Sequence, residues 1–280
     1  MKKAGYALLA VWIVIASTLS GAISVAAAPA LDIVSSSAIL MDADTGEVLY
    51  GKNISQKMYP ASITKILTGL LAMEICHSDE LISVSASAIK IPRGYAHIAL
   101  TAGDKISVGN AMYAAMLASA NDAANALAEH VGGTQEEFAD LMNKRAEEIG
   151  TQNSNFVNAS GIPSKNHYTT AYDMALITRE ASQNEAFMRY FGASSYILPA
   201  FNTQTQETEI INYQFMLQED KEEYSPDVIG GKIGYTGQAG HTMSTVAQRN
   251  GRTLICVVLG STRDGKYSDT PMLLDYGFDM

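Results

Sequence analysis

The chain has 280 residues, of which 47% are hydrophobic and 17% are charged, and its formal net charge at pH 7 is −10. This composition is that of a globular protein with a sizeable core, and it excludes an intrinsically disordered chain. The acidic balance, without an arginine-rich run or a basic patch, argues against nucleic acid as a partner.

The first thirty residues differ from the rest of the chain. A short positive start precedes an uncharged apolar run over residues 7–19, and small residues follow it. This is the three-part layout of a secretory signal peptide. We expect residues 1–28 to be a signal peptide that is cleaved near residues 27–30, so that residues 29–280 are exported. The alternative is an uncleaved N-terminal anchor, which would be the only route of membrane association.

The exported part opens with a predicted hairpin over residues 36–50, because two strand-like segments flank a turn-forming stretch. A helix over residues 60–74 follows at once. Pro60 fits its first turn, where a missing N–H costs nothing. Ser62 and Lys65 are three residues apart at the start of this helix, so their side chains share one face.

This pair has the chemistry of an activated nucleophile. A serine at a helix start lies beside free backbone N–H groups and the positive end of the helix dipole. A lysine in an apolar setting loses its proton near neutral pH, because burial disfavours the charged form. Lys65 could therefore serve as the base for Ser62. The alternative is an ordinary helix-cap serine with a solvated lysine, since S-x-x-K often occurs by chance.

The middle of the chain is mostly helical. Short strands and loops over residues 80–103 precede four helical segments, and residues 195–215 form a loose hairpin. The helical segments are 108–117, 123–131, 135–149 and 170–183. Between the first two, Ser119 and Asn121 should be presented on a turn. Ser119 could relay a proton and Asn121 could hold a lysine or a substrate carbonyl, or either could simply cap the next helix.

The C-terminal part turns to strands again, with a short closing helix over residues 269–278. The strands are expected at 228–235, 242–247 and 253–260. Lys232 and Gly234 lie in the first of them, where a ligand could lie along the backbone, or the lysine could simply protect a sheet edge. Strands at both chain ends predict an α/β (α+β) fold, in which an antiparallel sheet from both ends is flanked by helices and carries an inserted, mostly helical lobe.

The two cysteines and five histidines give little sign of a cofactor. An exported chain could join Cys76 to Cys256, but the first ends a helix-like run and the second lies in an apolar strand. We therefore favour two buried free thiols. The histidines lack the spacing of metal ligands, so we expect no metal and no cofactor.

Taken in order, S-x-x-K, S-x-N and K-x-G resemble the active-site motifs of penicillin-binding proteins and serine β-lactamases. Longer segments extend the likeness over about residues 36–278. These segments are 60–65, 118–124, 155–158, 167–175 and 273–278. The chain is most similar to the D-alanyl-D-alanine carboxypeptidases, the low-molecular-weight penicillin-binding proteins of bacterial cell walls. Many relatives carry a C-terminal β domain, which we do not expect here because the sequence stops at residue 280.

The resemblance implies a β-lactamase/DD-peptidase-like fold and a serine-type carboxypeptidase that removes the terminal D-alanine from peptidoglycan stem pentapeptides. Ser62 would be the nucleophile and Lys65 its base. Ser119 would pass the proton to the leaving D-alanine. Asn121 would bind the peptide backbone and steady Lys65, and Lys232 would help to hold the terminal carboxylate.

The resemblance also implies the rest of the site and its surroundings. The N–H groups of Ser62 and Tyr235, next to Gly234, would form the oxyanion hole. Arg263 or Lys266 would contact the carboxylate from the loop that follows. The substrate would be a peptidoglycan stem peptide outside the bacterial membrane, and β-lactams, which imitate D-Ala-D-Ala, would acylate the nucleophile.

The sequence departs from the family pattern in the third motif. Ile233 stands where the family usually has threonine, whose hydroxyl helps to bind the carboxylate, and Thr236 could stand in for it. The alternatives are therefore a D,D-endopeptidase or a β-lactamase of the same fold, or a non-catalytic wall-binding homologue. A β-lactamase is the least favoured enzyme, because no glutamate motif for a deacylating water is evident.

Overall fold

The computed structural model describes residues 31–280, and the expected signal peptide lies outside these described residues. A five-stranded antiparallel sheet, in the order β2-β1-β9-β8-β7, forms its centre. Its strands come from the two ends of the described chain: β1 (Ser37–Asp42), β2 (Val48–Lys52), β7 (Val228–Thr236), β8 (Gly240–Arg249) and β9 (Arg252–Ser261). The prediction of a sheet built from both chain ends is confirmed.

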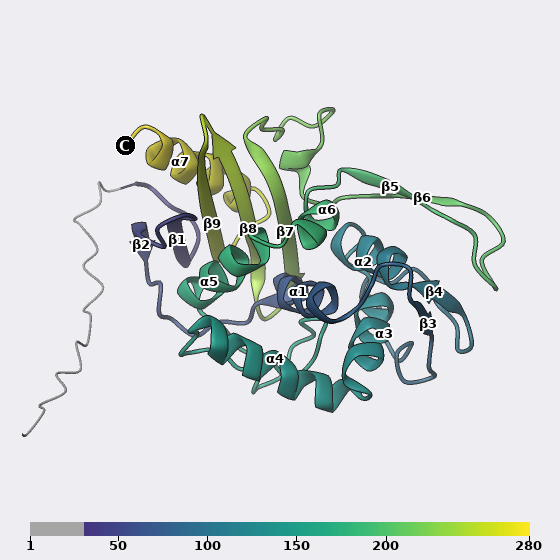
Figure 1. Cartoon of the computed structure of the whole chain (residues 1–280). Coiled ribbons are helices and arrows are strands. Elements are labelled where there is room, and N and C mark those ends of the chain that lie inside the picture. Colours follow the sequence, from purple (N-terminus) through teal and green to yellow (C-terminus); the bar gives the residue numbers. More distant parts are fainter. Residues whose placement is uncertain (1–30) are drawn as a thin grey trace, which may run out of the picture.

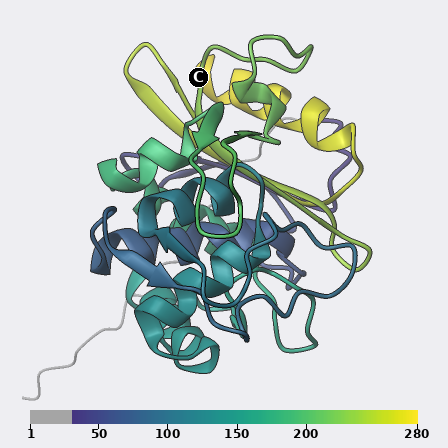
Figure 2. The ribbon, with the colours of Figure 1, turned by 90° about the vertical axis from the view of Figure 1, so that its right-hand side faces the viewer.

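The segment between β2 and β7 forms the inserted lobe. Its helices are α1 (Lys65–Ile75), α2 (Val108–Met116), α3 (Asn121–Gly132), α4 (Gln135–Ile149), α5 (Ala171–Ser182) and α6 (Glu185–Phe191). Two small hairpins complete it, β3 (Leu81–Ser83) with β4 (Lys105–Ser107) and β5 (Ser195–Leu198) with β6 (Thr208–Ile211). The last helix, α7 (Gly265–Phe278), lies across the sheet from the lobe (Figures 1 and 2).

The sheet is buried on both faces, so the middle parts of β1 (residues 38–41) and β9 (residues 254–259) are apolar at every position. Along β1, Ile39 and Met41 join the core shared with the lobe, whereas Ala38 and Leu40 join the core under α7. Successive side chains of a strand point to opposite faces, which explains the alternation. On the α7 side the packing is close: a Cβ at Gly277 would lie 2.5 Å from a Leu40 methyl carbon.

Local signals set several boundaries as predicted. The side chain of Thr134 accepts a hydrogen bond from Glu137 N at the start of α4, and Gly150 ends this helix with φ +102°. Thr170 caps α5 in the same way. Asn250 and Gly251 both have positive φ, which is the geometry of a tight hairpin turn between β8 and β9.

Three expectations need correction. Helix α6 was not predicted, because seven residues are too few to show a clear period. Helix α7 begins at Gly265, four residues earlier than expected, and its early part is fixed by long-range contacts: Asp269 accepts hydrogen bonds from Val34 N and Ser35 N. Both cysteines are free as predicted, but only Cys256 is fully buried, whereas the other is half-buried.

Within residues 31–280, no helix combines the length and the apolarity that crossing a bilayer requires.

Candidate active site

A cleft of about 520 Å³ lies where the lobe meets strand β7. Six of the eight predicted site residues line it: Ser62, Ser119, Asn121, Gly234, Tyr235 and Arg263. The remaining two, Lys65 and Lys232, are buried behind its wall. The structure therefore brings together residues that are up to two hundred positions apart in the sequence.

Lys65 is the most enclosed of these residues, with no exposed surface. Ser62 lies in a short 3-10 turn, Ala61–Thr64, that leads directly into α1, and Lys65 is the first residue of that helix. The Lys65 amine lies 3.2 Å from Ser62 Oγ, 2.7 Å from Asn121 Oδ1 and 2.7 Å from the Ser160 carbonyl oxygen. The alternative of a solvated lysine beside an ordinary cap is wrong.

The surroundings of Lys65 favour its neutral form. Burial, and next the positive charge of Lys232, hold the pKa of Lys65 well below its usual value. A neutral amine has two N–H groups and one lone pair. Because the oxygens of Asn121 and Ser160 can only accept hydrogen bonds, they take the two N–H groups. The lone pair is then left facing the Ser62 hydroxyl, as a general base requires.

The turn between α2 and α3 presents Ser119 and Asn121 to the cleft, as predicted. Asn121 donates through both its backbone N and its side-chain Nδ2 to the carbonyl oxygen of Ala96, at 2.9 and 3.0 Å. These bonds orient the amide so that its oxygen faces the buried amine. Helix α3 begins after Ala120 without a side-chain cap, so the alternative that either polar residue is an ordinary cap is wrong.

Backbone strain is concentrated beside the nucleophile and on this turn. Ala61 has φ +52° and Ser119 has φ +56°, a region that non-glycine residues rarely adopt. Gly161 packs against the first of them so closely that a Cβ there would lie 1.8 Å from the Ala61 carbonyl oxygen. Such strain costs on the order of 1–3 kcal/mol per residue and is typical of functional sites.

Strand β7 passes directly against the nucleophile. A Cβ at Gly234 would lie 2.7 Å from Ser62 N and 2.6 Å from Thr242 Oγ1. Thr242 in turn donates a hydrogen bond to the Pro60 carbonyl oxygen at 2.8 Å, which fixes the 3-10 turn to the sheet. Since β7 is the edge strand, its outer backbone groups face the cleft rather than another strand.

The second buried lysine, Lys232, points from β7 behind the cleft wall. Its amine donates to the Ile233 carbonyl oxygen at 3.3 Å, and burial lowers the pKa of Lys232 to about 7. A positive charge on Lys232 disfavours a second one on Lys65, so it helps to lower the pKa of Lys65.

One end of the cleft is cationic although the whole chain is acidic. Arg263 is exposed there, whereas Lys266 is buried and donates to the Arg263 carbonyl oxygen at 2.8 Å. Burial and the charge of Arg263 lower the pKa of Lys266 to about 8. Among the described residues that line the cleft, none is Asp or Glu. The cleft is therefore suited to a negatively charged ligand.

Ile233 lies on the cleft wall, on the strand of the third motif. An apolar side chain thus occupies the place where a hydroxyl was expected from the family pattern. Thr236 also lines the cleft, but its Oγ1 accepts a hydrogen bond from Ala239 N at 3.0 Å within the turn after β7. Its hydroxyl hydrogen stays available as a donor.

Sequence reasoning missed the Ser160 carbonyl oxygen, which is one of the three partners of the buried amine. Asn158 shapes its loop, since Asn158 Oδ1 accepts from Ser160 N and Gly161 N. A backbone carbonyl has no side-chain signature. The only signals in the sequence were the asparagine and the glycine, which are typical of a tight turn.

Sequence reasoning also assigned no role to His167, which is fully buried behind the nucleophile. Its Nδ1 accepts from Val157 N, so Nε2 carries the hydrogen and donates to Thr64 Oγ1 at 2.9 Å. Burial, and next the charge of Lys65, lower the pKa of His167 to about 4, so it stays neutral. This histidine fixes the loop of residues 155–169 against the turn that carries the nucleophile.

A wall of aromatic rings lies opposite the nucleophile and was not predicted either. The rings of Phe215 and Tyr267 are parallel, with centroids 5.8 Å apart, and the Tyr267 hydroxyl donates to the Tyr213 carbonyl oxygen. Tyr95 and His241 complete it. These residues come from four separate segments, and no local pattern in the sequence groups them.

Comparisons with known proteins agree with this geometry. A family model described as D-alanyl-D-alanine carboxypeptidase matches residues 23–263. The D-alanyl-D-alanine carboxypeptidase DacF of Bacillus subtilis is 34% identical over 246 residues, which make up 86% of this chain and 61% of that protein. DacC of Escherichia coli is 30% identical, over 86% of this chain and 60% of its own length. The chain spans about three fifths of the length of these relatives.

Two solved structures are also similar to this chain over most of its length. The D-alanyl-D-alanine carboxypeptidase from Mycobacterium tuberculosis is similar with a TM-score of 0.81 and 27% identity, over 90% of this chain and 94% of that one. A single-residue variant of a Streptomyces DD-transpeptidase has a TM-score of 0.82 and 26% identity, over 89% of this chain and 99% of that one.

Proposed function

This chain belongs to the D-alanyl-D-alanine carboxypeptidase family, and on that premise we propose that it is a serine-type D,D-carboxypeptidase. It removes the terminal D-alanine from peptidoglycan stem pentapeptides through an acyl-enzyme on Ser62. The observation that carries this proposal is the arrangement of the Lys65 amine, whose two N–H groups have carbonyl acceptors and whose lone pair faces the Ser62 hydroxyl.

In the acylation step, Ser62 Oγ attacks the carbonyl carbon between the two terminal D-alanines, and its proton moves to Lys65 Nζ. The carbonyl oxygen becomes an oxyanion, which the backbone N–H groups of Ser62 and Tyr235 stabilise. The close approach of Gly234 to Ser62 N supports this arrangement. One such donor is typically worth ~3 kcal/mol of transition-state stabilisation.

The leaving group then needs a proton. Ser119 gives its hydroxyl proton to the departing D-alanine nitrogen and regains one from protonated Lys65. A water molecule next attacks the ester carbon and gives its proton to the same amine, which restores the free Ser62 hydroxyl. Each proton that the amine takes up is returned, so the cycle balances.

Arg263 is the proposed contact of the substrate's terminal carboxylate. It is exposed at the cleft, and no acidic side chain forms an ion pair with it among the described residues. Lys266 is less available, because it bonds to a backbone carbonyl and lies over the ring of Tyr267 at 3.7 Å from the centroid. Lys232 adds positive charge from behind the wall.

The proposal is tested with a stem pentapeptide and a fluorescent penicillin. We expect covalent labelling by the penicillin and release of free D-alanine from the pentapeptide. Cleavage of cross-linked dimers without release of D-alanine would favour an endopeptidase instead, and rapid turnover of the penicillin would favour a β-lactamase. Absence of labelling would leave only a non-catalytic wall-binding protein.

Gly234→Ala is expected to lower the rate of acylation by about 10²–10³-fold, the usual cost of losing one oxyanion donor. The added methyl would lie 2.7 Å from Ser62 N, so β7 must move away from the nucleophile. Gly237→Ala is the matched control, since a Cβ there meets no atom within 4 Å. The rate of covalent labelling by penicillin is measured for both variants. Equal rates in the two would show that the close approach is not needed.

Ile233→Thr is expected to raise kcat/KM for D-alanine release by about tenfold, because a hydrogen bond to a charged group contributes ~1.5 kcal/mol. The new hydroxyl would face the carboxylate from the cleft wall. Ile229→Thr makes the same change on the same strand but outside the cleft and should leave the rate unchanged. An unchanged or lower rate in Ile233→Thr would contradict this view of the third motif.

The site of action follows from the substrate. Peptidoglycan lies outside the bacterial membrane, so we propose that residues 1–28 direct export and that residues 29–280 form the catalytic domain. An uncleaved N-terminal segment would also attach the domain to the membrane. Mass spectrometry of the mature N-terminus from the native host tests this, and a protein that keeps its first residue would support an uncleaved anchor.

A further inference from the structure

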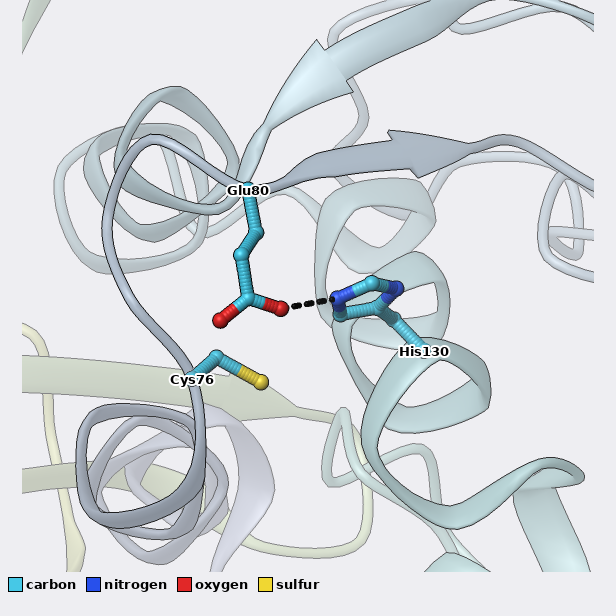
Figure 3. A group of neighbouring side chains, drawn as sticks. All are labelled: Cys76, Glu80 and His130. Carbon is cyan, nitrogen blue, oxygen red and sulfur yellow. Dashed lines mark hydrogen bonds and ion pairs between the residues drawn. The ribbon is translucent and has the colours of Figure 1, made fainter.

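A second group of reactive side chains lies outside the cleft. Cys76, Glu80 and His130 converge from three separate elements (Figure 3). Their potential ligand atoms all lie within 4.8 Å of one another, and His130 Nε2 is 3.2 Å from Glu80 Oε2. The cysteine follows the last turn of α1, the glutamate directly precedes β3, and the histidine belongs to the last turn of α3.

Backbone hydrogen bonds hold Cys76 and Glu80 in place, and His130 lies within α3. Cys76 N donates to the Ala72 carbonyl oxygen at 2.9 Å, which ends α1. The Glu80 carbonyl oxygen accepts from Val108 N at 2.9 Å, and Glu80 Oε1 accepts from His77 N at 2.6 Å. The second bond leaves Oε2 directed at the imidazole. The group is thus supported before any ligand arrives.

The ligand atoms are reachable from solvent. The side chains of His130 and Glu80 are 26% and 39% exposed, and Cys76 is half-buried. An ion can therefore enter, and a water molecule can complete its coordination.

We propose that Cys76 Sγ, a Glu80 carboxylate oxygen and His130 Nε2 bind a Zn²⁺ ion, with water as the fourth ligand. A thiolate, an imidazole and a carboxylate are the three ligand types that zinc takes in proteins. Magnesium and calcium need several oxygen ligands, and this group offers one carboxylate. Two ligands of one tetrahedral zinc lie about 3.3–3.7 Å apart, so side-chain movements of about 1 Å close the site.

The position of this site suggests what the ion does. Helix α1 begins with Lys65 and α3 begins with Asn121, which are hydrogen-bonded to each other in the cleft. The zinc ligands lie at the opposite ends of the same two helices, about 16 Å away for an eleven-residue helix. Zinc at this point joins the far ends of α1 and α3, so it stabilises their packing rather than taking part in the chemistry.

This inference differs from the expectation of no metal that was drawn from the sequence. That expectation was based on ligand spacing along the sequence, and the histidine is far from the other two residues in the chain. The inference does not depend on the proposed peptidase activity.

The test uses the untagged mature protein after treatment with a chelator. Titration with Zn²⁺ against a chromophoric indicator should give one equivalent bound per chain. At a free zinc concentration of a hundred times Kd, Tm should rise by about 5 °C. Cys76→Ala and His130→Ala should each weaken binding by at least about 10–100-fold. Cys256→Ala, which removes the other thiol, should bind like the wild type.

Replacement of zinc by Co²⁺ provides a second readout that does not depend on stability. A thiolate–cobalt charge-transfer band should appear in the wild type and in Cys256→Ala, and it should be absent in Cys76→Ala. If Cys76→Ala folds poorly, Cys76→Ser replaces it, because a hydroxyl fills nearly the same space. The proposal is overturned if the wild type binds no zinc at one equivalent or if the charge-transfer band persists without Cys76. In that case Glu80 and His130 form an ion pair only.

Discussion

Ser62→Ala is expected to abolish covalent labelling by a fluorescent penicillin and to lower D-alanine release by at least about 10⁴-fold. The reason is that an acyl-enzyme needs an oxygen on the residue that faces the Lys65 lone pair, 3.2 Å away. The loss of one hydroxyl on a half-buried residue leaves the packing of α1 intact. Circular dichroism should therefore show an unchanged fold.

Ser55→Ala is the control for this variant, because Ser55 is exposed and lies outside the cleft. It should be labelled at the wild-type rate. Continued D-alanine release by Ser62→Ala, at more than a few per cent of the wild-type rate, would contradict the mechanism. The chemistry would then have to start from another nucleophile, and Ser119 is the other serine that lines the cleft.

Lys65→Met is expected to reduce the acylation rate by about 10⁴-fold, since general-base catalysis typically contributes 10²–10⁴-fold and Lys65 Nζ is the amine that lies 3.2 Å from Ser62 Oγ. Met fills nearly the same volume, but it leaves Asn121 Oδ1 and the Ser160 carbonyl oxygen without a donor. Each unpaired buried acceptor costs about 1–3 kcal/mol, so we also expect a lower Tm. Stopped-flow measurement of penicillin acylation checks the rate.

The control is Lys144→Met on the exposed face of α4, which should change neither the rate nor Tm appreciably. A Lys65→Met variant that acylates within tenfold of the wild type would show that another group takes the Ser62 proton.

The pH dependence of the wild-type acylation rate gives an independent check of the role of Lys65 as the general base. The base must be neutral, and the pKa of Lys65 is lowered by burial and by the charge of Lys232. Below this lowered pKa the amine is protonated and has no lone pair for Ser62. The acylation rate should therefore rise as pH increases through this lowered pKa, well below the usual pKa of lysine. A rate that rises only near the usual pKa of lysine would contradict a neutral buried amine.

The sequence was informative wherever the structural signal is local. The Thr170 cap, the Gly150 stop and the Asn250-Gly251 turn each act through neighbouring backbone groups, so a short segment is enough to predict them. The apolar segments at both chain ends likewise predicted a sheet built from them. The order of the three motifs pointed to the family before any distance was known.

Other features arose only when distant segments packed together. Helix α6 is too short to have a period, and the start of α7 depends on Asp269 contacts with the first described residues. The aromatic wall and the group around Cys76 also combine elements that no spacing rule connects. Neither group can be predicted from the spacing of residues along the sequence.

The sequence by itself determined which residue types are available for catalysis: two serines, two lysines and an asparagine in the order of a known family. Only the tertiary structure decided the protonation states of these side chains. The pKa of Lys65 is lowered because the fold removes its amine from water and places it near Lys232, and two carbonyl oxygens, one of them the backbone carbonyl of Ser160, accept its hydrogen bonds. Protonation depends on burial and on neighbouring charges, which are properties of the packed chain and not of the order of its residues.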